Sequence, residues 1–317
     1  MYPLAISTIN LTRDFKTVRA VDRLSLDVPA GIVCGFLGPN GAGKTTTISL
    51  LLGILEPTWG EARVLGYDTR SQSGEIRMRT GALLEHHGLY ERLTVAENLD
   101  FYGRVWRIPA KERSARIHEL LIHVDLWDRR NERVVTLSHG MKQKLAVSRA
   151  IFHRPSLLFL DEPTAGLDPM AATALRNDIA DLVKKEGMTV FLTTHNLSEA
   201  EKLCSLVGVI SKGKLLTVGH PDELRARAGK ARVEVVGRGF TETAVAKIQA
   251  HPGVQAVEIQ NPVEAHGRVS LHITLAEDMT AAPLVRLMVG EGIEIEEVRR
   301  GAASLEEAFL KLMENDQ

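Results

Sequence analysis

The chain has 317 residues, enough for two domains, and it is 44% hydrophobic and 25% charged, as in ordinary globular proteins. Its 39 basic and 40 acidic side chains give a net charge of -1, which argues against bulk attraction to nucleic acid or anionic lipid. Two cysteines are too few for a disulfide framework, the first residues lack the pattern of a secretory signal, and no apolar run is long enough to span a membrane.

The first predicted elements surround a glycine-rich loop. Residues 24–37 predict a strand, a Pro-Ala-Gly turn and a buried strand, and a helix that follows GPNGAGK stops before Pro57. Glycines let backbone N–H groups curl around phosphates, Lys44 reaches the terminal phosphates, and Thr45 offers a hydroxyl to Mg²⁺. The sequence therefore predicts a nucleoside triphosphate site made by Gly38, Pro39, Asn40, Gly41, Ala42, Gly43, Lys44, Thr45 and Thr46.

Residues 88–152 are mostly helical in pattern. Thr94 and Glu97 predict a capping box, and Ser138 predicts the N-cap of a basic, amphipathic helix. Capping explains the serine but not Gly140, because a glycine in the first turn lowers helix stability. This helix end is therefore expected to have a second task.

Two buried strands then end in polar side chains. Residues 156–163 predict a strand that ends at Asp161 and Glu162, and residues 188–195 predict one that ends at His195, with a helix between them. Strands that alternate with helices indicate an α/β fold with a parallel sheet, whose carboxyl edge is where ligands bind. We expect Asp161 to hold Mg²⁺ and Glu162 to be the general base that orients the attacking water.

A polar segment at residues 219–231 separates a second unit. Its predicted order is strand (232–236), helix (241–250), strand (254–259), strand (269–275), helix (280–290) and strand (293–299), and a last helix, SLEEAFLKLM, follows. That βαββαβ order predicts a small ferredoxin-like α+β domain. The expected division is a first domain at 1–225 with a helical subdomain at about 88–152, a linker at 226–231, and a C-terminal domain at 232–317.

The C-terminal domain is not expected to bind RNA. Residues 232–299 contain ten acidic and six basic side chains, and the predicted strands lack the aromatic residues on which bases stack. A domain that stabilises a dimer or contacts a partner is the favoured interpretation, and no nucleic-acid partner is expected.

With these motifs in order, residues 4–225 resemble the nucleotide-binding subunits of ABC transporters. GPNGAGKTT is similar to Walker A, LSHGM to the signature LSGGQ, LLFLDEP to Walker B, AGLDP to the D-loop, and TTH to the switch histidine. Within the family, the chain is most similar to ATPases of bacterial multidrug or ABC-2 type exporters. The resemblance implies a P-loop NTPase fold of the ABC type, ATP and Mg²⁺ as cofactors, a catalytic role for His195, and a location on the cytoplasmic face of the membrane. It also implies integral membrane permease subunits as partners, and a homodimer or a heterodimer with a second ATPase subunit.

The same resemblance assigns further residues. Ser138 and Gly140 would donate to the γ-phosphate of ATP held by the other subunit, and Asp168 lies in the D-loop. Glu85 aligns with the Q-loop glutamine, where a carboxylate could meet Mg²⁺. Phe15 stands where the family has an aromatic that stacks on adenine, although a core phenylalanine is nearly as good an interpretation, and stacking alone leaves GTP open. His139 and Met141 depart from the signature.

The favoured function is ATP-driven export. The alternative is a soluble ABC-type ATPase that acts on nucleic acid, ribosomes or a protein assembly. It is disfavoured because the chain has one cassette and lacks long coiled coils and zinc motifs. A sensor without turnover is disfavoured by the presence of Glu162 and His195.

Overall fold

The chain forms two compact bodies, Met1–Pro221 and Asp222–Gln317. The computed structural model describes residues 3–228, 232–260, 269–276, 280–301 and 305–314. Both cysteines, Cys34 and Cys204, are buried free thiols.

A six-stranded sheet of order β10-β9-β3-β8-β7-β6 forms the centre of the first body. Neighbours from β9 to β6 are parallel, and β10 is antiparallel to β9. The strands are β3 (Val33–Leu37), β6 (Thr80–Leu83), β7 (Leu157–Asp161), β8 (Thr189–Thr194), β9 (Leu206–Ser211) and β10 (Lys214–Gly219). Every residue of β3, β7 and β8 is buried. Their continuous apolar runs predicted this burial, because the strands of a parallel sheet covered on both faces have no side exposed to solvent.

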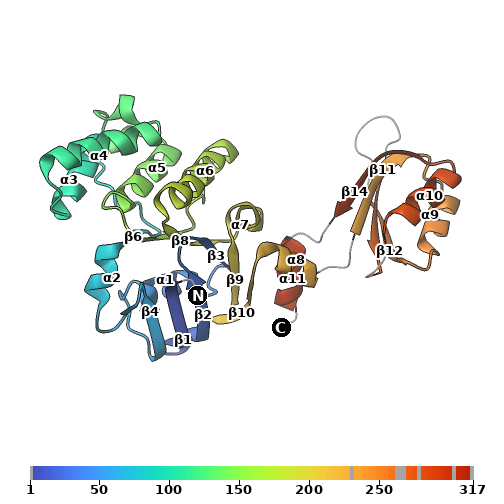
Figure 1. Ribbon diagram of the computed structural model, residues 1–317, viewed down its shortest axis with the longest axis horizontal. Helices are drawn as coiled ribbons and strands as arrows, with labels where there is room; N and C mark the ends of the chain where they lie inside the picture. The colour runs from blue at the N-terminus through green and yellow to red at the C-terminus, as the bar shows by residue number, and fades with distance from the viewer. Residues whose placement is uncertain (1–2, 229–231, 261–268, 277–279, 302–304, 315–317) are drawn as a thin grey trace. The chain divides into compact units, whose positions relative to one another are not determined.

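A second, antiparallel sheet has the order β2-β1-β4-β5. Its strands are β1 (Leu4–Phe15), β2 (Val18–Pro29), β4 (Trp59–Val64) and β5 (Tyr67–Asp68). Helix α1 (Lys44–Leu51) lies between the two sheets (Figure 1), and its Ile48, Leu50 and Leu51 are buried in one core with residues of both. That packing holds the start of α1, and so the glycine-rich loop, in a fixed place.

Helices fill the predicted helical segment and also lie before and after it. They are α2 (Ser73–Arg79), α3 (Val95–Val105), α4 (Ala110–His123), α5 (His139–Ala150), α6 (Pro169–Glu186) and α7 (Leu197–Leu203), with 3-10 turns at Trp127–Arg129 and Val134–Thr136. Thr94 caps α3 with both bonds of the predicted capping box. Figure 1 shows α3, α4 and α5 grouped together, away from the antiparallel sheet.

The C-terminal body has the predicted βαββαβ order. Its sheet, β12-β13-β11-β14, is antiparallel, and counted along the domain its strand order is the 2-3-1-4 of a ferredoxin-like fold. Buried residues of α9 and α10 share one core with β11 and β13. The elements are α8 (Pro221–Ala228), β11 (Arg232–Arg238), α9 (Glu242–Gln249), β12 (Val254–Gln260), β13 (Val269–Leu275), α10 (Ala282–Gly290), β14 (Glu294–Gly301) and α11 (Leu305–Glu314).

The boundary differs from the expectation in one respect. Residues 226–228 belong to α8 rather than to a linker, and the division falls after Pro221. Residues 229–231 lie outside the described part of the chain.

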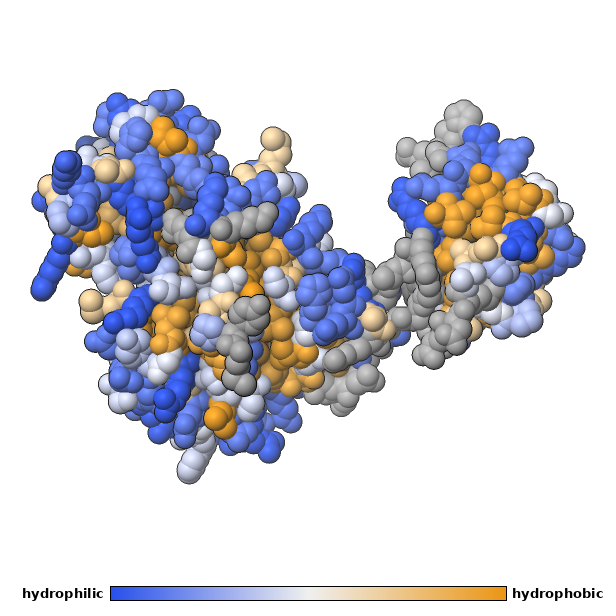
Figure 2. All heavy atoms as spheres, in the orientation of Figure 1, coloured by the Kyte–Doolittle hydropathy of each residue, from blue (hydrophilic) through white to orange (hydrophobic). Residues whose placement is uncertain are grey.

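Figure 2 shows apolar side chains on the visible surface of the C-terminal body, whose exposed large hydrophobic residues include Ile259, Val289 and Val298.

Candidate active site

The glycine-rich loop joins β3 to α1 and can exist only with glycine at two positions. Gly43 precedes α1 with φ 105°, in the left-handed region, and a Cβ on it would lie 2.3 Å from the carbonyl oxygen of Ala20. A Cβ on Gly38 would lie 2.4 Å from the carbonyl oxygen of Ile210. The loop therefore packs directly against the backbone of neighbouring strands, and the first N–H groups of α1 remain available for an anion.

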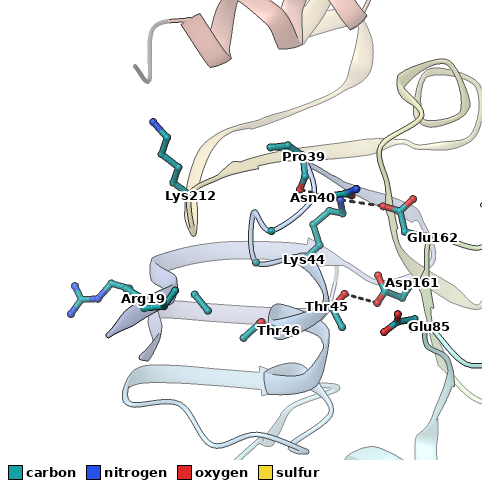
Figure 3. Close-up of a pocket in the computed structure, with 14 residues that line it drawn as sticks. Arg19, Pro39, Asn40, Lys44, Thr45, Thr46, Glu85, Asp161, Glu162 and Lys212 are labelled. Carbon is teal, nitrogen blue, oxygen red and sulfur yellow. Dashed lines mark hydrogen bonds and ion pairs between the residues drawn. The ribbon is translucent and has the colours of Figure 1, made fainter. Parts of the chain in front are cut away.

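Lys44, the first residue of α1, is buried across this loop. Its Nζ donates to the carbonyl oxygens of Gly38 at 2.7 Å and Pro39 at 3.3 Å, and lies 3.1 Å from Oε1 of Glu162. Figure 3 shows the side chain pointing toward Glu162. The ammonium is thus held at the place where the loop would enclose phosphate groups.

Asp161 connects the loop to the central sheet. Its Oδ2 accepts a hydrogen bond from Oγ1 of Thr45 at 2.7 Å, although 116 residues separate the two, and its Oδ1 accepts one from Oγ1 of Thr193 at 2.5 Å. Glu85 lies beside this pair (Figure 3) and lines the same cavity, whose volume is about 600 Å³. One hydroxyl and two carboxylates facing one cavity form a donor set that suits Mg²⁺, which prefers oxygen ligands.

Glu162 follows β7 in a left-handed backbone conformation, with φ 50°. Its N–H donates to both the carbonyl oxygen and Oγ1 of Thr193, each at 3.1 Å. Nδ1 of His195 lies 2.6 Å from Oε2 of Glu162, so the imidazole donates to this carboxylate. A carboxylate that a histidine orients beside a phosphate-binding loop is arranged as a general base.

Four cavity-lining residues were missed by the sequence reasoning. They are Val18, Arg19, Ala20 and Lys212, which come from β2 and the β9–β10 turn. No motif marks them, and the only available signal was the short apolar and basic run after Phe15. Phe15 itself ends β1, is 40% exposed and contacts the Arg13 guanidinium, but it does not line this cavity. Stacking of Phe15 on adenine therefore stays a prediction.

Ser138, Gly140 and Asp168 lie at two helix starts and do not line the cavity of their own chain. Ser138 is the N-cap of α5 and accepts from the N–H of Met141 at 3.3 Å. Asp168 is the N-cap of α6 and accepts from the N–H groups of Met170 and Ala171, each at 3.0 Å. Within one chain, Ser138 and Asp168 serve as caps, and Gly140 lies in the first turn of α5.

The chain is similar to known proteins over most of its length. Residues 21–165 match the family model described as ABC transporter. The chain is 36% identical over 308 residues to the bacitracin transport ATP-binding protein of Bacillus licheniformis, covering 97% of each chain. It is 36% identical over 314 residues to the daunorubicin/doxorubicin resistance ATP-binding protein of Streptomyces peucetius, covering 97% of this chain and 92% of that one. A solved ATP-binding subunit of an ABC transporter superposes with a TM-score of 0.64 at 29% identity, over 70% of this chain and 92% of that chain.

Proposed function

This chain belongs to the ATP-binding subunits of the ABC transporter family and is an ATPase, and from that premise we propose that it powers export through a separate membrane permease. One observation carries the proposal at the level of chemistry: Lys44, Thr45, Asp161, Glu162 and His195 meet at one loop. The relatives named for bacitracin transport and drug resistance favour export over the alternative of a soluble ATPase that acts on nucleic acid or a protein assembly.

In the proposed reaction, the loop N–H groups and Lys44 bind the triphosphate. Glu162 accepts a proton from the attacking water while the water oxygen bonds to the γ-phosphorus and the bond to the β–γ bridging oxygen breaks, leaving ADP and phosphate. The His195 N–H donated to Glu162 keeps the carboxylate oriented. Thr45 and Asp161, with Glu85 nearby, would hold Mg²⁺, which neutralises phosphate charge when bound.

The pairing of Lys44 with Glu162 has a consequence for this reaction. Their charged atoms lie 3.1 Å apart, so a triphosphate that draws the ammonium toward itself competes with Glu162 for it. Binding of ATP would therefore free one carboxylate oxygen to face water.

A second cavity supports the permease as partner. It has a volume of about 340 Å³ and lies between the end of α1, β6, and helices α3 and α5. Large apolar side chains border it, among them Ile54 at 55% and Val105 at 60% exposed, and the ring of Trp106 lines it. No helix in the described part of the chain is long and apolar enough to cross a membrane. An apolar segment of the permease on the cytoplasmic face is the occupant that we assign to this groove.

The proposed power stroke is closure of a dimer, either of two copies or with a second ATPase subunit. Ser138 and Gly140 at the start of α5 would then bind the partner's γ-phosphate through charge-assisted hydrogen bonds. Neither residue lines the cavity of its own chain, which agrees with a role in trans.

The substitution Glu162→Gln tests the reaction. The amide keeps the shape of the side chain but accepts no proton, so we expect kcat to fall at least about 100-fold while ATP still binds. Steady-state phosphate release and nucleotide titration measure the two effects. Glu112→Gln, at an exposed position in the first turn of α4, is the matched control. Hydrolysis by Glu162→Gln at the wild-type rate would show that another residue is the base.

A further inference from the structure

The first turn of α5 packs against the segment that follows Glu162. His139 and Gln143 are four residues apart, so they lie on one face of the helix. Nε2 of His139 lies 3.2 Å from the carbonyl oxygen of Ala165, and because a carbonyl only accepts, this nitrogen carries the proton. Nε2 of Gln143, which is buried, donates to the carbonyl oxygen of Pro163 at 2.5 Å. Two carbonyl groups just beyond the catalytic carboxylate are thus held by α5.

The residue between those two carbonyl groups is held by a different helix, α7. Oγ1 of Thr164 donates to Oε2 of Glu199 at 2.5 Å, and Glu199 is buried and paired with Arg176, whose Nη1 lies 3.0 Å from Oε1. Residues 163, 164 and 165 therefore each have a specific anchor. The anchor at residue 165 differs from the others, because it is an exposed histidine where the family signature has glycine.

His139 also contacts the loop that carries Glu85. The rings of His87 and His139 meet edge to face with centroids 5.3 Å apart. On the other side, a Cβ on Gly166 would lie 3.3 Å from Nε2 of His139. The imidazole thus contacts both the loop that carries Glu85 and the loop that carries Glu162.

We propose that His139 is a positioning residue for hydrolysis, which ties the start of the signature helix to the loop of the catalytic base in the same chain. The inference rests on the proposed function. In the closed dimer the start of α5 binds the partner's triphosphate, and a shift of that helix end is passed through His139 to Ala165 and the backbone of Glu162. Engagement of one ATP site would in this way adjust the base of the other.

Three variants of the 317-residue chain test the role of the His139 N–H group. His139→Gly restores the family residue and removes the ring, His139→Leu keeps bulk without a donor, and His139→Gln supplies an amide N–H that can reach the same carbonyl oxygen. Because one hydrogen bond is at stake, we expect kcat for ATP to fall about 3- to 10-fold in the glycine and leucine variants, with KM within about twofold of wild type. The glutamine variant should recover at least half of the wild-type kcat.

The control is His118→Asn on α4, whose ring packs on Trp127, and it should leave kcat unchanged. Wild-type kcat in the glycine variant, or a glutamine variant as slow as leucine, would overturn the positioning role. Circular dichroism checks that the glycine variant folds. If it does not, the kcat values of the glutamine and leucine variants test the positioning role without it. A wild-type chain without ATPase activity would instead contradict the proposed function, so the two failures are distinguishable.

Discussion

Single residues in this protein do several tasks at once. Lys44 is bonded to two loop carbonyl groups and paired with Glu162, and Thr45 is bonded to Asp161. Lys44, Thr45 and Asp161, which would bind phosphate or Mg²⁺, therefore each already have a protein partner. Such contacts restrict the side chains to a few positions, which lowers the entropy cost of arranging them around a ligand.

At this scale, Lys44→Ala is expected to weaken ATP binding about 10- to 100-fold, because a charge-assisted hydrogen bond to phosphate is lost. The same change leaves Oε1 of Glu162 without its cationic partner. Isothermal titration with ATP measures the affinity, and Lys111→Ala on the exposed surface of α4 is the control. An affinity equal to that of wild type would contradict the assignment of the phosphate site.

Among the elements, the junction of β6 with α3 and the end of α5 is distinctive. The ring of His153 stacks on Trp106 with centroids 3.9 Å apart, and its Nε2 donates to the carbonyl oxygen of Thr80 at 3.1 Å. Burial lowers the pKa of His153 to about 4. The contact joins the helical subdomain to the edge of the central sheet, and burial there disfavours the protonated imidazole.

This junction predicts a pH dependence of stability. An unfolded histidine binds a proton below about pH 6.5, whereas folded His153 stays neutral down to about pH 4, so its contribution is complete above pH 6.5 and decreases as the pH falls toward 4. His153→Phe keeps an aromatic ring against Trp106 but does not titrate. We expect the free energy of unfolding to fall less between pH 7 and pH 4.5 in the variant than in wild type. Denaturant titrations at several pH values measure the free energy of unfolding. The same decrease in wild type and in His153→Phe would contradict the prediction.

The whole molecule has two bodies, and the proposed site in each ATPase body is completed by another chain. Ser138 caps α5 but does not line the cavity of its own chain, so the donors expected from the signature helix would come from a second chain. The C-terminal body adds a ferredoxin-like domain with exposed apolar residues such as Ile259 on β12 and Val289 on α10. A role in dimer stability or partner contact remains our proposal for it.

Dimer closure predicts a change in molecular mass. Glu162→Gln with ATP and Mg²⁺ should elute as a dimer and with ADP as a monomer, because only the triphosphate bridges the two chains. Adding Ser138→Arg should keep the protein monomeric with ATP, since a bulky cation at the helix start obstructs the interface. Size-exclusion chromatography with light scattering measures the molecular mass. Nucleotide titration checks that the double variant still binds ATP. An ATP-bound dimer of the double variant would contradict the role in trans.

Local patterns were sufficient for much of this protein. The buried runs of β3, β7 and β8, the glycine-rich loop and the βαββαβ order of the C-terminal body all follow from contiguous residues, and the structure confirms the predicted fold class. By contrast, no strand was expected at residues 4–15. β1 pairs there with irregular register shifts and Asn10 has φ 47°, so its apolar residues do not alternate regularly.

The sequence alone was sufficient to predict which residues would bind phosphate and metal, because side-chain type and the spacing of a loop before a helix are local properties. Only the tertiary structure decided which of them meet: Thr45 with Asp161, Lys44 with Glu162, and His139 with Ala165. It also added Arg19 and Lys212 to the cavity and gave Phe15 no place in its wall. Such contacts depend on the order of the strands in the sheet and on how α5 packs against it. Neither can be read from the periodicity of the sequence or from hydrogen bonds between neighbouring residues.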